Sequence, residues 1–161
     1  MKLCILGGGL TGLSLAKSLV KKGLSIDIFL NKKKSDFNRS RTIGISNDNL
    51  MYFNKEILDI KKLFWDIKKI EIYSENLRNE KILNFENNNK TVFAIIRNYQ
   101  LQSKLLKSLK KEKLCKFKQN FDYNLSNLKK YKLIINCEND NYFTKKFFAR
   151  SLKKKYDSLA Y

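Results

Sequence analysis

Three glycines near the start of the chain, spaced Gly-x-Gly-x-x-Gly, constrain the fold more than any other feature. The run Leu3–Leu6 before them is apolar without alternation, which is typical of a parallel strand buried on both faces. Apolar residues at helical spacing follow the last glycine, and a second apolar run covers Ile26–Leu30. Strand, glycine turn, helix and strand in this order predict the first βαβ unit of a dinucleotide-binding fold.

Each glycine of this motif has its own physical role. Gly7 permits a tight turn off the strand, and Gly9 has no Cβ to hold a pyrophosphate away from the backbone. Gly12 lets the helix pack close to the sheet. The helix N-terminus then offers unpaired N–H groups and the positive end of its dipole to phosphates. The motif therefore predicts a phosphate-binding turn, and the alternative is a glycine-rich turn that binds no ligand.

The carboxylate that usually binds the ribose of a dinucleotide is missing. It is expected at the end of the second strand, roughly 20 residues after the glycines. Leu30 occupies that position and Asn31 follows it, so only a shift of one residue would supply a polar acceptor. Asp27 lies too early in the strand to point at the ribose. The sequence predicts an intact phosphate end and a weakened ribose end.

The formal net charge of +19, from 34 Lys and Arg against 15 Asp and Glu, would suit nucleic acid or an anionic membrane. The lysines, however, are spread in pairs and triplets among many asparagines, as an AT-rich coding sequence favours. The sequence contains no nucleic-acid-binding motif. We therefore expect no specific nucleic-acid partner and keep peripheral contact with an anionic membrane as an open alternative.

The chain also lacks several features that would direct it elsewhere. No apolar stretch approaches the roughly 20 residues that cross a membrane, and the N-terminus does not resemble a signal peptide. The sequence has no histidine, which excludes zinc sites built on histidine and Ser-His-Asp catalysis. Cys4, Cys115 and Cys137 are far apart and are expected to be reduced. We expect a cytoplasmic protein that can associate peripherally with the inner membrane.

Hydrophobic periodicity predicts the remaining elements. Ser46 can cap a helix, and a second short helix is expected around Ile57–Phe64. A further helix begins at Asn98 or Ser103 and continues to about Lys111. The expected strands after the first βαβ unit are 69–74, 81–85, 91–96, 114–117 and 133–136.

Several segments, in chain order, resemble the class A FAD-dependent monooxygenases, and in particular the ubiquinone-biosynthesis hydroxylases. Arg41–Ser46 resembles an Arg-x-x-x-Leu-Ser segment that opens a helix, and Ile96–Leu101 resembles the segment leading into the helix under the flavin. Leu133–Asn139 stands where that family has a strand ending in Ala-Asp-Gly. Tyr156–Ala160 resembles the strand that re-enters the substrate sheet. Only the glycine motif is specific by itself.

The resemblance implies an α/β fold: a Rossmann-like FAD-binding domain with an incomplete antiparallel sheet of a substrate domain. Residues 1–68 and 97–152 would form two parts of the FAD-binding domain. Residues 69–96 would supply strands of the incomplete sheet, and 153–161 would begin a truncated substrate domain. The implied activity is hydroxylation of an aromatic ring in ubiquinone biosynthesis, with FAD as cofactor and NAD(P)H and O2 used by the complete enzyme.

The resemblance also assigns residues to the cofactor. The three glycines would hold the FAD pyrophosphate, and the two residues between Gly9 and Gly12 would donate backbone N–H groups. A guanidinium would lie alongside the adenosine diphosphate, although the same arginine is equally well an exposed basic residue, and one glutamine would approach from the next helix. These cofactor-binding residues are Gly7, Gly9, Leu10, Thr11, Gly12, Arg41 and Gln102. No catalytic side chain and no metal ligand is assigned.

The chain departs from the family at three positions and in its length. Glu138-Asn139 replaces Asp-Gly, Leu30 replaces the ribose acid, and Arg97 stands where glutamate is common. The sequence ends at Tyr161, where the family's second half begins. We therefore expect a chain that is inactive alone. Two outcomes stay open: a separate polypeptide supplies the missing C-terminal half, or the chain is a decaying gene fragment.

Two further expectations follow from that length. The strands at 69–96 should form a small meander with open edges and exposed apolar side chains. The alternative function is a non-catalytic nucleotide-binding or interaction domain, a degenerate fragment that keeps the fold without the chemistry.

Overall fold

The computed structural model describes residues 2–30, 39–74, 78, 80–119, 121–124 and 128–148, and a four-stranded parallel sheet organises them. The strands are β1 (Lys2–Leu6), β2 (Ser25–Leu30), β8 (Cys115–Gln119) and β9 (Leu133–Asn136). They lie in the order β8-β2-β1-β9, and every neighbouring pair is parallel. Counted along the chain, this order is 3-2-1-4, as in doubly wound nucleotide-binding folds. The predicted α/β fold class is confirmed.

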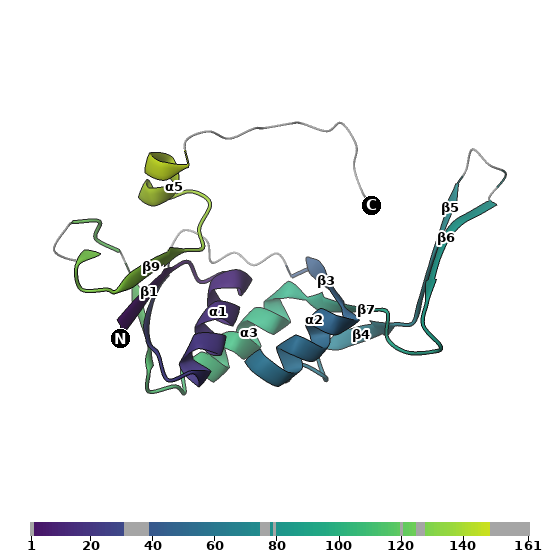
Figure 1. Cartoon of the computed structure of the whole chain (residues 1–161), viewed down its shortest axis with the longest axis horizontal. Helices are drawn as coiled ribbons and strands as arrows, with labels where there is room; N and C mark the ends of the chain where they lie inside the picture. The colour runs from purple at the N-terminus through teal and green to yellow at the C-terminus, as the bar shows by residue number, and fades with distance from the viewer. Residues whose placement is uncertain are drawn as a thin grey trace.

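Two helices, α1 (Leu10–Lys21) and α3 (Asn98–Leu109), cover one face of the parallel sheet (Figure 1). Because strand side chains alternate between faces, every second residue of β1 and β2 points toward these helices. The helices return apolar side chains at helical spacing. The resulting core contains Leu3, Ile5, Ile26 and Ile28 of the sheet, Leu13, Ala16 and Val20 of α1, and Leu101, Leu105 and Leu109 of α3.

A second, antiparallel sheet stands beside the first one. Its strands are β3 (Thr42–Ser46), β7 (Phe93–Arg97) and β4 (Phe64–Ile67), with β7 in the middle. Helix α2 (Asn47–Tyr52) follows β3, as predicted, and its N-cap residue is Ser46.

The prediction of a short helix around Ile57–Phe64 is wrong. A single π-turn, Phe53–Ile57, ends there, and Leu58 is already extended. The side chain of Asn54 accepts a hydrogen bond from Ile60 N at 2.7 Å, so a side-chain acceptor replaces the next helical turn. The apolar residues that suggested a helix are Leu58, Leu63 and Phe64. They pack against the core from an irregular segment and from the start of β4.

A long hairpin of β5 (Lys69–Ser74) and β6 (Glu80–Glu86) projects from this end of the molecule (Figure 1). The expected three-stranded meander is wrong, because the third run is β7 and pairs with β3 and β4 instead. Pairing in the middle of that sheet satisfies both edges of β7 and buries Ala94 and Ile96. The open edges and exposed apolar side chains of the hairpin are as expected.

Helix α5 (Tyr142–Phe147) follows β9 and lies on the side of the parallel sheet away from α1 and α3 (Figure 1). The sequence did not predict this helix. The expected start of a substrate domain, 153–161, lies outside the described residues, and the division of the chain into domains stays a prediction. Among the described helices, none combines the length and apolar character that crossing a bilayer requires.

Candidate nucleotide-binding site

The predicted glycine turn lies at the point where the strand order of the parallel sheet reverses. β1 has β2 on one side and β9 on the other, and the turn Gly7–Gly9 leaves the carboxyl end of β1. Gly7 N donates to Phe29 O at 3.0 Å, and Cys137 N donates to Leu6 O at 2.8 Å. These bonds join the ends of three strands around the turn. Open α/β sheets bind their ligands at such a crevice.

Gly7 and Gly12 are required by the packing of the turn itself. Gly7 has a φ of +112°, which side chains rarely adopt, and a Cβ there would lie 2.9 Å from Cγ of Glu138. A Cβ on Gly12 would overlap the carbonyl oxygen of Gly7. The close approach predicted for Gly12 is therefore between the helix and the turn, with Ile5 of the sheet next to it.

Gly9 is different, because its packing within the protein does not require a glycine. It is exposed, its φ of −74° is ordinary, and a Cβ there would meet no atom within 4 Å. A glycine that the protein's own packing does not need, at the head of a helix, leaves room for a ligand to reach the backbone. The structure thus provides the space that a pyrophosphate would need.

The first turn of α1 offers hydrogen-bond donors to this space. Gly9 is the N-cap residue and supplies no side-chain cap, and the first turn contains no acidic residue. Leu13 N donates to Gly9 O, but among the described residues no acceptor is recorded for the N–H groups of Leu10, Thr11 and Gly12. Three free donors at the positive end of a helix dipole favour an anion.

Gln102 reaches the glycine turn from α3. Its side chain is buried, and its Nε2 donates to Gly8 O at 2.7 Å across 94 positions of sequence. The structure therefore brings Gln102 to the turn, as the resemblance implied. Its direct contact with a cofactor stays a prediction.

A groove of about 360 Å³ lies beside α3, and Gln102 is one of the residues that line it. Three cations line it, Arg39, Lys107 and Lys110, together with Tyr99 and other α3 side chains. The sequence did not single out these cations, because they are separated along the chain and share one side only once α3 forms.

Arg41 lies just before β3, and its carbonyl oxygen accepts a hydrogen bond from Asn98 N, the first residue of α3, at 3.0 Å. It is exposed and is not among the residues that line the groove. Its place beside a diphosphate stays a prediction.

The ribose end of the site is apolar, as the sequence indicated. Leu30 points back onto the turn, where a Cβ on Gly8 would overlap its Cδ2 atom. This packing leaves no acceptor at the usual position of the ribose acid. Asn31, the alternative acceptor, lies outside the described residues.

Asp27 does not face the site, which confirms the sequence-based expectation. Its side chain is only 1% exposed and binds Lys2 Nζ at 2.9 Å, Lys118 Nζ at 2.6 Å and the hydroxyl of Tyr131 at 2.7 Å. Burial pushes the pKa of Asp27 upward, but the hydrogen bonds from Lys118, Lys2 and Tyr131 outweigh it and leave the pKa below its ordinary value. Burial and the hydrogen bond to Asp27 raise the pKa of Tyr131 to about 12. This cluster joins β1, β2 and β8 and has a structural role.

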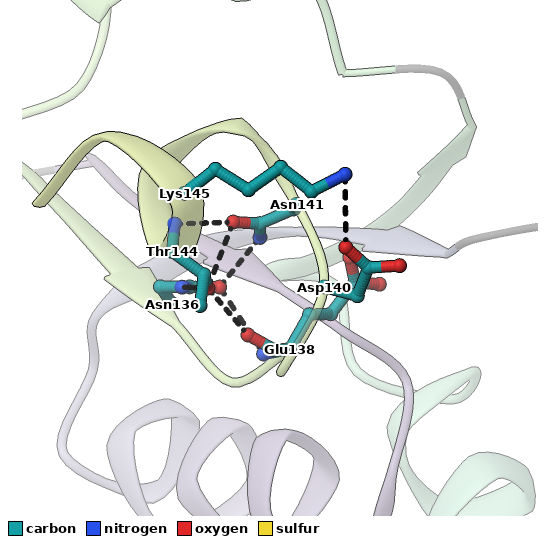
Figure 2. Close-up of polar contacts among 6 residues, drawn as sticks. All are labelled: Asn136, Glu138, Asp140, Asn141, Thr144 and Lys145. Atoms are coloured by element: carbon teal, nitrogen blue, oxygen red, sulfur yellow. Dashed lines mark hydrogen bonds and ion pairs between the residues drawn. The ribbon is translucent and has the colours of Figure 1, made fainter. Parts of the chain in front are cut away.

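A network of polar side chains fixes the segment after β9 (Figure 2). Asn136 Oδ1 accepts from Glu138 N at 3.1 Å and from Asn141 Nδ2 at 2.6 Å, and Asn136 Nδ2 donates to Thr144 Oγ1 at 2.8 Å. Thr144 Oγ1 donates to Glu138 O at 3.0 Å. The network holds Glu138 against Gly7 without the glycine that the family has there. The spacing Asn141-x-x-Thr144, typical of a helix N-cap, was the available signal for this segment.

The cysteines offer no reactive thiolate or disulfide. All three are free, and burial raises the pKa of Cys4 to about 12 and that of Cys115 to about 11. Burial, followed by the charge of Glu138, also raises the pKa of Cys137. Within the described part of the chain, no group of three or more metal-ligating side chains comes together.

Comparison with known proteins identifies the fold. No family model and no curated protein matches the sequence. PqsL of Pseudomonas aeruginosa, described as a probable FAD-dependent monooxygenase, matches with a TM-score of 0.68 and 10% identity over 97% of this chain and 48% of PqsL. This chain has the fold of FAD-dependent monooxygenases.

Two further structures agree. The p-nitrophenol 4-monooxygenase PnpA from Pseudomonas putida matches with a TM-score of 0.60 and 15% identity over 73% of this chain and 31% of PnpA. HpxO of Klebsiella pneumoniae, solved with FAD and uric acid, matches with a TM-score of 0.54 and 18% identity over 73% of this chain and 30% of HpxO. The chain therefore spans about half the length of PqsL and about a third of the other two.

Proposed function

We propose that this chain is the FAD-binding portion of a flavin-dependent aromatic-ring hydroxylase. One observation carries the proposal: open space over Gly9, bordered by free N–H donors at the reversal point of the sheet, in a fold shared with FAD-dependent monooxygenases. The residues present fit a dinucleotide diphosphate, because the backbone around Gly9 is accessible and no acidic residue lies in the first turn of α1.

In this proposal the residues of the turn position the cofactor. Gly9 admits the pyrophosphate, and the backbone N–H groups of Leu10 and Thr11 bind its oxygens. Gln102 holds the carbonyl of Gly8 and so fixes the shape of the turn. Arg41 and the groove cations add positive charge for the adenosine diphosphate. When bound, FAD supplies the redox chemistry, with NAD(P)H as the reductant of the complete enzyme.

The finer assignment is a hydroxylase of ubiquinone biosynthesis that acts in the cytoplasm. The order of the Arg41–Ser46, Ile96–Leu101 and Leu133–Asn139 segments supports it. The residues that complete the flavin and substrate sites would come from further sequence, in this polypeptide or in a separate one that supplies the second half.

A second candidate is a non-catalytic nucleotide-binding domain. Leu30 packs on Gly8 and the stem of Glu138 lies against Gly7, so an apolar and an acidic side chain border the turn. In this candidate the backbone of the turn binds a diphosphate, and the chain makes no contact that is specific to the flavin. Competition distinguishes the two candidates, because only the first predicts that FAD binds more tightly than ADP.

The test is titration of the purified chain with FAD, followed by visible absorbance and flavin fluorescence. We expect saturable binding that Gly9→Asp weakens by at least about tenfold, because a carboxylate there repels the pyrophosphate. The matched control is Asn87→Asp, which adds the same charge in the exposed turn after β6. It should leave FAD binding unchanged.

The absence of FAD binding by a chain with native circular dichroism would overturn the proposal. Equal affinity for FAD and ADP would favour the second candidate. Equal losses in Gly9→Asp and Asn87→Asp would assign the binding to overall charge and not to the turn.

A further inference from the structure

Helix α5 lies on the side of the parallel sheet away from the core helices (Figure 1). The helix and the residue after it carry exposed aromatic rings and lysines. Tyr142 is 47% exposed, Phe147 63% and Phe148 70%. Lys145 and Lys146 lie between them and are also exposed. We call these five residues the α5 patch. Large apolar side chains this exposed are a liability in water unless something covers them.

Contacts between aromatic rings hold α5 against the parallel sheet. Phe143, a half-buried residue of the helix, packs edge-on against Tyr123 at 5.3 Å between ring centroids and stacks with Phe147 at 6.2 Å. Phe121 continues this row of rings to Phe29 of β2. The inner rings therefore anchor α5, and the outer rings are held facing outward.

Positive charge accompanies the exposed rings. The Lys146 ammonium lies 5.5 Å from the ring centre of Tyr142 and 5.6 Å from that of Phe147. In the sequence, an arginine and three lysines follow the helix, and no acidic residue occurs between Asp140 and Asp157. Asp140 pairs with Lys145 at 3.1 Å, but both side chains are more than 70% exposed, so the pair leaves Lys145 accessible.

We propose that the α5 patch binds the surface of an anionic lipid bilayer. The rings of Phe147 and Phe148 enter the headgroup region, and the ammonium groups of Lys145 and Lys146 bind lipid phosphates. The proposal does not depend on the FAD site. The net charge left peripheral contact with a membrane open, and this proposal locates that contact on α5.

Charge separates this patch from another exposed apolar surface, the one on the β5–β6 hairpin. On the β5–β6 hairpin, Glu71 pairs with Lys69 and Lys81, and Glu80 and Glu86 of β6 add further negative charge. Opposite charges therefore balance one another beside the apolar side chains. A negatively charged surface would attract the α5 patch and would have no such attraction for the hairpin.

The test is co-sedimentation of the full chain with vesicles of phosphatidylcholine alone or with added phosphatidylglycerol. We expect binding only to the anionic vesicles, with a loss of about fivefold for each lysine replaced in Lys145→Gln and Lys146→Gln. The double variant Phe147→Ser/Phe148→Ser should lower binding by at least about tenfold. Both rings are exposed, so the fold should survive, and thermal unfolding checks that it does.

The matched control is Met51→Ser/Tyr52→Ser, which removes two neighbouring side chains of similar exposure, 63% and 56%, from α2. It should bind anionic vesicles like the unmodified chain. Equal losses in the two double variants would overturn the proposal, as would equal binding to neutral vesicles. If the chain does not bind vesicles but binds RNA, and Phe147→Ser/Phe148→Ser weakens that RNA binding, the patch is a nucleic-acid site and the proposal is wrong.

Discussion

At the scale of single residues, Gly9 and Gly12 are glycines for opposite physical reasons that a pair of alanine variants can separate. Gly12→Ala places a methyl group on the carbonyl oxygen of Gly7, and we expect it to lower the free energy of unfolding by about 2 kcal/mol. Gly9→Ala meets no protein atom, so its unfolding free energy should change by less than about 0.5 kcal/mol. Gly9→Ala should nevertheless weaken FAD binding.

Urea unfolding and FAD titration of both variants provide the measurements. A large loss of stability in Gly9→Ala would contradict the open space described at that position. Unchanged FAD affinity in Gly9→Ala would contradict close approach of the ligand to the backbone.

The Asp27 cluster predicts how stability depends on pH. Because the pKa of Asp27 is lower in the folded chain than in the unfolded chain, its contribution is present above about pH 4 and is lost as the pH falls through the folded pKa. Asp27→Asn removes the charge between Lys2 and Lys118 and should lower the free energy of unfolding at pH 7 by about 2 kcal/mol. Urea unfolding at pH 7 and pH 3 should show this difference shrinking in acid.

Tyr131→Phe provides the alkaline counterpart. The pKa of Tyr131 is about 12 in the folded chain, above its ordinary value, so its contribution is present below about pH 10 and is lost as the pH rises toward 12. Tyr131→Phe should cost about 1 kcal/mol at pH 7 and remove that alkaline loss. If Asp27→Asn keeps the acid loss of unfolding free energy, or Tyr131→Phe keeps the alkaline loss, other titrating groups are responsible.

At the scale of elements, the β5–β6 hairpin forms a two-stranded sheet that pairs with no other described strand. Ile72, Leu83 and Phe85 are 43%, 47% and 46% exposed, and a two-stranded hairpin is marginal by itself. We expect Leu83→Lys to raise several-fold the concentration at which the chain self-associates, with the unfolding free energy changed by less than about 0.5 kcal/mol. Analytical ultracentrifugation measures the association.

Asn84→Lys is the matched control, because it adds the same charge to the opposite face of the hairpin, where Asn84 pairs with Glu71. It should leave self-association closer to that of the unmodified chain. Equal effects of Leu83→Lys and Asn84→Lys would show that net charge, and not the apolar face, governs association.

The sequence predicted some elements better than others. Elements whose partners are close in sequence were predicted well, and those whose partners are distant were not. The β1–α1–β2 unit was predictable because the apolar strands, the glycines and the helical spacing are contiguous. Strand β3 was missed, and the partners of β7 were misassigned, because pairing with β3 and β4 is decided by burial of Ala94 and Ile96 far along the chain. Helix α5 was missed because its aromatic and lysine side chains do not form an apolar stripe.

At the scale of the whole molecule, the parallel sheet has two unlike faces. One face carries the aliphatic core under α1 and α3, whereas the other carries Asp27 with its cations and the aromatic row that leads to α5. The predicted turn and Gln102 meet at the reversal point, so the position of the turn in the fold was predictable. The packing of Leu30 and Glu138 on the turn was not, because it depends on how three separate strands end.

The hydrogen bond from Gln102 to Gly8 has a consequence for the order in which the protein matures. It spans 94 positions, and β1 also needs β9 as its second neighbour. On the ribosome, the glycine motif emerges first, yet its turn is completed only after α3 and then β9 have been synthesised. The glycine turn is therefore among the last parts of the described fold to reach its final form, and under the proposed function a nucleotide binds only after β9 has been synthesised.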